Sequence, residues 1–416
     1  METVAVTGIG LITGDHLSAE GQFSALFNGE STIKKDVRLL DLGIDNIVSS
    51  PISSSVISKL KNKHIRCDDN NYEGTYVAFD AVVQAVHFAG LKKEMLKNAG
   101  LFLGVNKIFP DNKDLNFLWD YYKGVNIADD DRSKVLQRLK HLKPDLISEY
   151  ISSRLSISGP SLVFGDACAA GAAAIMSGFR RIQQGQLDVA ICGASEFGTQ
   201  PIMQLLFTKL GATCSQTFPT PEQTSRPFDK DRSGCVLADA AAFLVLENAD
   251  LAKRQGKKVL AYISGASRQI ESYKLTATNP DGSLYRECIE KALEDAQLSP
   301  DAISHVNAHG TSTVSNDQAE SRALASLFSN STTVTSTKSA LGHSLAASGA
   351  IEAVLSVMSI EKQQVLPTLN FTEPKPEEPR LNIVKRGASQ AINHVLSNSF
   401  GFGGENCCLI FSKEYP

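Results

Sequence analysis

Short apolar runs alternate along this chain with longer stretches in which apolar residues recur every three or four positions. In the first half, the apolar runs predict buried strands at residues 4–8, 101–105, 162–164, 189–194 and 243–246. Residues 72–90 predict a helix, because their apolar side chains fall on one face at helical spacing. Residues 31–70 look polar and irregular, and the charged segment 110–144 is expected to cover the surface.

The same alternation begins again after a charged segment at residues 253–258. The second half predicts, in order, a strand at 259–265, a helix at 284–297, a strand at 304–308, a helix at 317–328, a strand at 332–336 and a small-residue helix from His343. Strands that alternate with helices are typical of a layered α/β fold. We therefore expect two similar halves, residues 1–255 and 256–416.

Two of the predicted helices consist almost entirely of small residues. One follows Cys168 and reads Ala-Ala-Gly-Ala-Ala-Ala-Ile, and the other follows His343 and reads Ser-Leu-Ala-Ala-Ser-Gly-Ala-Ile. Side chains this small indicate helices that are deeply buried. Because the two helices occupy equivalent places in the two halves, packing them face to face would bring Cys168 and His343 together.

Cys168 is a candidate nucleophile because of its place in the chain. It follows a predicted strand and a turn at Gly165 and Asp166, and it lies at or near the first turn of a helix. Unpaired N–H groups and the positive end of the helix dipole favour an anion there and lower the pKa of a thiol. The alternative is a buried structural cysteine, which is what most free cysteines are.

Two histidines lie in similar surroundings far downstream. His309 precedes a Gly-Thr-Ser-Thr turn, and His343 follows Lys338 and opens the second small-residue helix. A single histidine is more often an ordinary core or surface residue. Two histidines, each at the entrance of a Gly- and Ala-rich element, are hard to explain by packing alone.

These residues resemble a known family, the β-ketoacyl-acyl carrier protein synthases, or condensing enzymes, of fatty acid and polyketide synthesis. The resemblance covers nearly the whole chain, and its ordered motifs lie at residues 4–10, around Cys168, at 225–234, around His309, at 338–352 and at 398–404. It implies a thiolase-like fold with five layers that is internally duplicated. It also implies an enzyme that needs no cofactor and no metal, because decarboxylation supplies the driving force.

The resemblance implies a role for each site residue. Cys168 would attack an acyl thioester, and backbone N–H groups of Cys168 and Phe402 would bind the oxyanion. After malonyl decarboxylation, His309 and His343 would donate Nε2–H hydrogen bonds to the enolate. Lys338 would act electrostatically, held by Glu352 or another carboxylate, although a purely structural ion pair remains the alternative.

The loop at residues 400–404 is expected to gate the site. Glycines let backbone approach a substrate closely, and Gly401 and Gly403 flank Phe402 in this loop. By resemblance, Phe402 would shift between acylation and binding of the extender. Phe400 looks more like a packing residue of the same loop.

The expected partner is an acyl carrier protein that bears acyl and malonyl groups. The family works as a dimer, so we expect a homodimer or a heterodimer with a related ketosynthase, paired along residues 161–164. The net charge of −4 gives no sign of nucleic-acid binding, and no apolar run is long enough for a membrane span. The chain opens on a strand without a signal peptide, and its eight scattered cysteines read as reduced thiols, so a cytoplasmic location is expected.

The sequence also departs from the family pattern. Asp166 replaces the usual Ser or Thr and would raise the thiol pKa unless it is paired or turned away. Residues 238–241 and Glu405 replace Gly-Glu-Gly-Ala and a threonine, and residues 67–70 lack the usual basic patch. These changes favour a specialised synthase, or alternatively a chain-length-factor-like partner that shapes the acyl tunnel without condensing. A thiolase is disfavoured, because Cys407 and Cys408 lie on the predicted final strand and not in a site loop.

Overall fold

The computed structural model describes residues 1–38, 47–64, 72–106, 119–124, 133 and 143–415. The main strands of the first half are β1 (Val4–Thr13), β4 (Gly100–Gly104), β5 (Ser161–Phe164), β6 (Val189–Phe197) and β7 (Leu237–Asn248). Those of the second half are β8 (Ala261–Ile270), β9 (His305–Asn307), β10 (Thr333–Thr335), β13 (His394–Phe400) and β14 (Glu405–Ser412). Every strand predicted from the apolar runs is present, with its ends moved by a few residues.

The strand order shows that the fold is internally duplicated. The strands lie side by side in the order β5-β4-β6-β7-β1 in the first half and β10-β9-β13-β14-β8 in the second. If the five main strands of each half are numbered by their order in the chain, both halves have the same spatial order, 3-2-4-5-1. The directions repeat as well, because the pairs involving the second strand are parallel and those involving the fifth are antiparallel. A short antiparallel contact between β1 and β8 joins the two sheets. We propose that the two halves divide between β7 and β8, near the boundary expected at residue 255.

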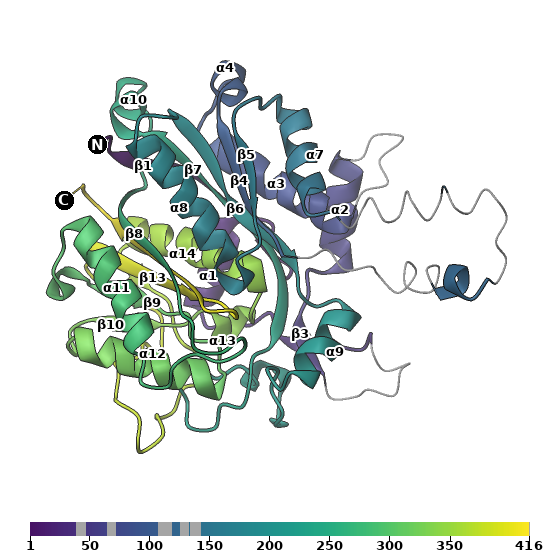
Figure 1. Cartoon of the computed structure of the whole chain (residues 1–416), viewed down its shortest axis with the longest axis vertical. Helices are drawn as coiled ribbons and strands as arrows, with labels where there is room; N and C mark the ends of the chain where they lie inside the picture. Colours follow the sequence, from purple (N-terminus) through teal and green to yellow (C-terminus); the bar gives the residue numbers. More distant parts are fainter. Residues whose placement is uncertain (39–46, 65–71, 107–118, 125–132, 134–142, 416) are drawn as a thin grey trace.

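Helices separate and cover the sheets, giving five layers (Figure 1). The middle layer contains α1 (Ala19–Phe27), α8 (Ala170–Gln183) and α14 (Ser348–Lys362). The outer layer of the first sheet contains α2 (Ser54–His64), α3 (Glu73–Phe88) and α7 (Asp145–Leu155). The outer layer of the second contains α11 (Ser283–Ala296) and α12 (Val314–Leu327). Separate hydrophobic clusters fill the central layer and the two outer interfaces, which confirms the predicted layered α/β class.

Glycines allow the central helices to come into backbone contact. A β carbon added to Gly171 of α8 would lie 2.8 Å from the carbonyl oxygen of Ala346 and 2.9 Å from the backbone nitrogen of Ala350. A β carbon added to Gly349 of α14 would lie 3.0 Å from the nitrogen of Ala172. The small residues of both helices are therefore required by close packing, as the sequence predicts.

Some predicted elements were wrong in detail. Residues 31–70 are not simply irregular, because they include β2 (Lys34–Lys35), β3 (Val48–Ser50) and α2. The helix expected from His343 begins at Ser348, after a 3-10 turn (Leu345–Ala347). Most of segment 110–144 and all of 67–70 lie outside the described residues. In the described part of the chain, no helix combines the length and apolar character needed to cross a bilayer.

The remaining short elements connect these layers. They are α4 (Lys93–Lys97), α9 (Pro201–Lys209), α10 (Ala249–Arg254), α13 (Lys338–Leu341), β11 (Gln364–Val365) and β12 (Ala388–Ser389). Of these, α9 and α13 contribute to the site, because α9 lies against the Phe402 loop and α13 begins with Lys338.

Candidate active site

Cys168 sits on a tight turn between β5 and α8. The chain leaves β5 at Phe164, and Cys168 lies in a 3-10 turn (Ala167–Ala169) that directly precedes α8. Ala167 has a φ of 48°, a left-handed conformation that an L-residue adopts only when its surroundings enforce it. Cys168 is buried, and its Sγ lies 3.2 Å from Nε2 of His343. The structure therefore brings the candidate nucleophile and one candidate histidine into direct contact.

The expectation that the helix terminus lowers the thiol pKa is wrong. Burial raises the pKa of Cys168 to about 11, against the charge of Lys338 and a hydrogen bond from the backbone N–H of Phe402, which both lower it. The carboxylates of Glu196 and Glu352 raise it further. At neutral pH the thiol is therefore protonated, and it needs a base at the moment of attack.

His343 is positioned to take that proton. Its backbone N–H donates to the carbonyl of Val236 at 2.6 Å, and its Nδ1 lies 2.9 Å from the hydroxyl of Ser348. Burial lowers the pKa of His343 well below its usual value, and the charge of Lys338 lowers it further. The ring is therefore neutral at rest. Because a hydroxyl can either donate or accept, Ser348 supports both tautomers of the ring.

His309 is oriented by Lys338, which lies behind it. The Lys338 ammonium donates to the carbonyl of His309 at 2.6 Å, lies 3.4 Å from Nδ1 of the same ring, and forms an ion pair with Glu352. An ammonium can only donate, so Nδ1 of His309 accepts and its proton is held on Nε2. Burial, Lys338 and His343 lower the pKa of His309 well below its usual value. The two imidazoles are thus neutral, with ring centroids 5.4 Å apart.

Two carboxylates of α12 support the His309 loop, and neither is among the site residues predicted from the sequence. Glu320 accepts hydrogen bonds from the backbone N–H groups of His309 at 2.8 Å and Gly310 at 2.7 Å. Asp317 accepts from the backbone N–H groups of Ser312 at 3.1 Å and Phe228 at 2.8 Å. Two acidic residues three positions apart, just after a Gly-Thr-Ser-Thr turn, are the signal that could have identified them.

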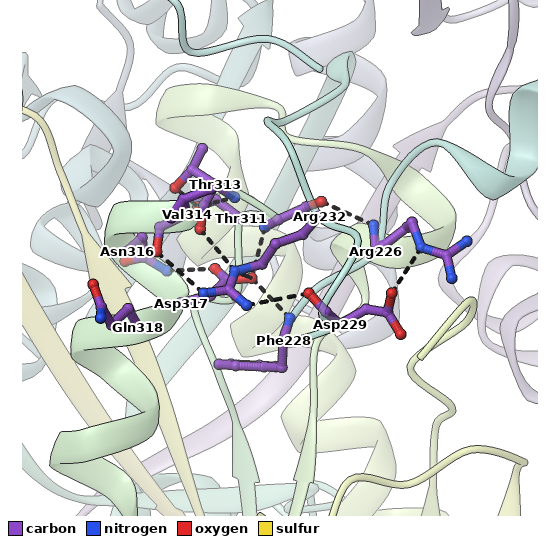
Figure 2. Close-up of polar contacts among 12 residues, drawn as sticks. Arg226, Phe228, Asp229, Arg232, Thr311, Thr313, Val314, Asn316, Asp317 and Gln318 are labelled. Carbon is purple, nitrogen blue, oxygen red and sulfur yellow. Dashed lines mark hydrogen bonds and ion pairs between the residues drawn. The ribbon is translucent and has the colours of Figure 1, made fainter. Parts of the chain in front are cut away.

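A buried arginine ties this loop to the preceding half. Figure 2 shows the Arg232 side chain between the backbone of Asp229 and the segment from Thr311 to Val314. Arg232 also forms an ion pair with Glu378 and lies 3.8 Å from Asp317. The recognised motif at residues 225–234 therefore acts on the site indirectly, by holding the loop that carries His309.

The glycine loop closes the other side of the site. Gly403 and Gly404 have φ values of 85° and 83°, which side chains rarely tolerate. The Phe402 ring stacks on Phe207 of α9 with centroids 6.2 Å apart. Gly401 is in contact with the cysteine turn, since a β carbon there would lie 3.2 Å from the nitrogen of Cys168. The Phe402 loop therefore lies against the cysteine turn, and the backbone N–H of Phe402 is bonded to the Cys168 sulfur.

Phe400 packs inside the protein and lines the pocket. Its ring stacks on Tyr285 with centroids 3.7 Å apart and lies 5.9 Å from the His309 ring. A pocket of about 270 Å³ leads from the surface to these groups. Its lining includes Cys168, His309, His343, Phe400, Phe402 and Lys274. The thiol and both imidazoles therefore share one accessible cavity.

The residues that depart from the family pattern are accommodated locally. Asp166 forms an ion pair with Arg268 at 2.7 Å, and Arg268 also contacts Glu405 at 3.2 Å. Asp166 therefore does not face the thiol as an unpaired charge. Asp239 is buried and accepts hydrogen bonds from the backbone N–H and hydroxyl of Thr199 at 2.9 and 2.8 Å. Burial raises the pKa of Asp239 to about 6.

The cysteines near the C-terminus do not suit a thiolase. Cys407 and Cys408 lie on β14 and point to opposite faces of the sheet. Both are buried, because helices cover both faces, so neither thiol reaches solvent. Burial raises the pKa of each thiol well above its usual value. Neither side chain lines the catalytic pocket.

Comparison with known proteins identifies the family. The chain matches the model of the beta-ketoacyl synthase N-terminal domain over residues 1–252 and that of the C-terminal domain over residues 260–372. The chain therefore belongs to the beta-ketoacyl synthase family, as the sequence motifs predict.

Curated relatives are named as synthases of this family. The chain is 38% identical over 272 residues to a 3-oxoacyl-[acyl-carrier-protein] synthase 2 of Synechocystis, covering 65% of each protein. It is 36% identical over 280 residues to the synthase 2 of Vibrio cholerae, covering 65% of this chain and 67% of the relative. The chain thus matches about two thirds of the length of these relatives.

Solved ketosynthases share the whole fold. A beta-ketoacyl synthase from Burkholderia phymatum has a TM-score of 0.87 at 27% identity, covering 100% of both chains. The ishigamide ketosynthase/chain length factor has a TM-score of 0.86 at 27% identity, covering 99% of both. AntDE:AntF, described as a type II polyketide ketosynthase in complex with its acyl-carrier protein, has a TM-score of 0.85 at 26% identity, covering 99% of this chain and 100% of that one. The fold is therefore thiolase-like, as predicted.

Proposed function

We propose that this protein is a β-ketoacyl-acyl carrier protein synthase that catalyses decarboxylative Claisen condensation of an acyl thioester with a malonyl thioester. The observation that carries the proposal is the contact of 3.2 Å between Sγ of Cys168 and Nε2 of His343, with His309 beside them in one pocket. The family and the named relatives support the same chemistry.

The first half-reaction transfers the acyl group to Cys168. As Sγ attacks the thioester carbonyl, Nε2 of His343 takes the thiol proton, because the raised pKa keeps the thiol protonated until then. The backbone N–H groups of Cys168 and Phe402 stabilise the oxyanion. When the intermediate collapses, the carrier thiolate leaves and takes the proton from His343. The products are acyl-Cys168 and a free carrier thiol, so atoms and charge balance.

The second half-reaction forms the carbon-carbon bond. The malonyl carboxylate leaves as carbon dioxide, and the electron pair moves to the thioester oxygen as an enolate. His309 donates its Nε2–H to that oxygen, and His343 does the same when Ser348 donates to its Nδ1. The enolate carbon then attacks acyl-Cys168, the carbon-sulfur bond breaks, and the released Cys168 thiolate takes up one proton from solvent water, which neutralises the charge that entered with the malonyl carboxylate. Neutral imidazoles suit this role because burial keeps both rings uncharged.

The proposed partners are an acyl carrier protein and a second ketosynthase subunit. Strand β5 lies at the end of the sheet order, and its Leu162 and Val163 are more than one third exposed, which supports dimerisation along this edge. We propose a cytoplasmic location on the basis of the cysteines, because those in the described residues are free thiols. We propose that the acyl group belongs to fatty acid, polyketide or polyene synthesis.

The chain-length-factor alternative is not favoured. The curated relatives are named as synthases, and the chain retains Cys168, His309, His343 and Lys338 in one cavity or directly behind it. A subunit that only shapes a tunnel would have no need of this constellation.

The test uses purified protein with acyl- and malonyl-carrier protein, alone and with a related ketosynthase. We expect carbon dioxide release and a product two carbons longer from the isolated chain, with loss of condensation in Cys168→Ala and of decarboxylation in His309→Ala. Condensation that requires the second ketosynthase and survives Cys168→Ala would contradict the proposal and would favour a tunnel-shaping partner.

A further inference from the structure

Three charged side chains from separate segments meet beside the active site. Asp166 belongs to the cysteine turn, Arg268 to β8 and Glu405 to the start of β14. Nη2 of Arg268 lies 2.7 Å from Oδ2 of Asp166 and 3.2 Å from Oε2 of Glu405. The two carboxylates are 14% and 23% exposed and the guanidinium is 39% exposed, so the cluster is only partly open to solvent. We call Asp166, Arg268 and Glu405 the arginine clamp.

The clamp connects the two segments that provide the proposed oxyanion donors. Asp166 lies two residues before Cys168, and Glu405 lies three residues after Phe402. Gly401 fills the space between these segments. Its N–H donates to the carbonyl of Glu405 at 2.7 Å, and a β carbon there would lie 3.2 Å from both the Asp166 carbonyl and the Cys168 nitrogen. A change in the separation of the two segments would therefore move the Phe402 N–H relative to Sγ.

Arg268 is needed to hold the two acidic segments together. Burial raises the pKa of Asp166, the Arg268 charge lowers it, and the Glu405 charge raises it. The guanidinium attracts both carboxylates, so it draws their two segments together and does more than offset the repulsion between them. Arginine stays charged, and its Nη2 contacts both carboxylates at once.

We propose that the arginine clamp is a positioning device that fixes the Phe402 loop against the Cys168 turn and thereby sets the spacing of the two backbone donors. Its effect on acyl transfer rests on the proposed function, whereas its effect on the loop does not. Arg268 touches neither substrate nor Cys168 and acts through the backbone of the two segments.

The loop is tested directly by hydrogen-deuterium exchange in Arg268→Met. The amides of Gly401, Gly403 and Gly404 are bonded to the carbonyls of Glu405, Leu275 and Gly401, so they report loop opening. We expect their exchange to accelerate about tenfold or more. The matched control is Arg286→Met, which breaks the exposed Arg286–Glu290 ion pair of 2.8 Å on α11 and should leave these amides unchanged. If Arg268→Met does not fold, Arg268→Gln provides the same test, because a neutral amide lacks the charge that attracts both carboxylates.

Acyl transfer from a small acyl thioester to Cys168, followed by mass spectrometry, tests the consequence. We expect Arg268→Met to slow transfer by about 10- to 100-fold, less than the roughly 100- to 1,000-fold cost of removing an oxyanion donor, because the donor is displaced and not lost. The neutral triple variant Asp166→Asn, Arg268→Met, Glu405→Gln separates position from charge. If the clamp positions the loop, acyl transfer should remain slow in this variant and its loop amides should still exchange fast.

Restoration of wild-type amide exchange and acyl transfer in the triple variant would overturn the proposal, because the loop would then hold its position without any contact from Arg268. Unchanged loop exchange in Arg268→Met would overturn it as well. If wild-type protein transfers no acyl group at all, the proposed function fails, while the exchange experiment still decides whether the clamp holds the loop.

Discussion

The buried thiol gives a direct test of the proposed proton path. Burial raises the pKa of Cys168 to about 11 from an ordinary value of 9.0. At pH 8 about one thiol in 1,000 is ionised in the protein, against about one in 10 for an ordinary thiol, because each pH unit below the pKa reduces the thiolate about tenfold. Alkylation by iodoacetamide, which requires the thiolate and no bound substrate, should therefore be about 100-fold slower than for an ordinary thiol at that pH.

The assay measures the pH dependence of Cys168 alkylation by mass spectrometry. The rate constant should rise about tenfold per pH unit and still be rising at pH 10, because ionisation sets the slope whatever the access to the pocket. Lys338→Met should move the curve to higher pH, since the Lys338 charge lowers the thiol pKa. N-acetylcysteine, run in parallel, provides the unburied reference.

A rate that levels off below pH 9 would refute this reasoning, because it would mean that the thiolate forms without a base. Acyl transfer from a bound thioester should not share the steep slope, since His343 takes the proton during attack. The contrast between the two pH profiles in one preparation therefore separates a stable thiolate from a thiol activated by His343.

Three further changes test other parts of the structure. Glu320→Gln keeps one acceptor oxygen but places an amide N–H₂ group against the N–H donor of either His309 or Gly310, so it should cost about 1–3 kcal/mol in denaturant unfolding and lower the decarboxylation rate. Lys338→Met should destabilise the fold by about 3–5 kcal/mol, because it leaves Glu352 buried and unpaired. The double variant Lys338→Met, Glu352→Gln should recover stability but not decarboxylation. Recovery of both would indicate a purely structural ion pair. Gly171→Val should lower the melting temperature sharply and cost about 3 kcal/mol or more, because its side chain would meet the backbone of α14, while Gly185→Ala, at an open turn, should cost much less.

Much of the fold could be predicted because its strands are buried on both faces. Such strands are continuous apolar runs in the sequence, so β4, β6 and β7 were visible without any alternation. Helix α2 was missed because only its Val56 and Leu60 are buried, which leaves little apolar periodicity to detect. The contact between Cys168 and His343 was predictable because both small-residue helices must pack closely.

The electrostatics of the site could not be predicted in the same way. The sequence places Cys168 at a helix terminus, but the burial that raises its pKa comes from residues distant in the chain, such as Met203, Cys235 and Leu345, which pack around it. The ion-pair partner of Asp166 could not be predicted either, because Arg268 lies 102 positions later in the chain and comes close to Asp166 only in the folded sheet, where β8 pairs with β14. A charge in a strand carries no local pattern that reveals its partner.

The duplication explains why each half contributes different chemistry from the same local geometry. Ala167 and Leu345 both have left-handed φ values, 48° and 49°, and each begins the 3-10 turn before its central helix. A left-handed non-glycine residue costs about 1–2 kcal/mol, so its presence in both halves indicates a turn that the fold itself enforces. In the first half this turn presents Cys168. In the second half the N–H of Ala346 at the equivalent position bonds Glu196, and His343 just before the turn reaches the thiol instead. One repeated strand-turn-helix thus provides the proposed nucleophile once and its proposed base once, on opposite sides of the contact between Gly171 and α14.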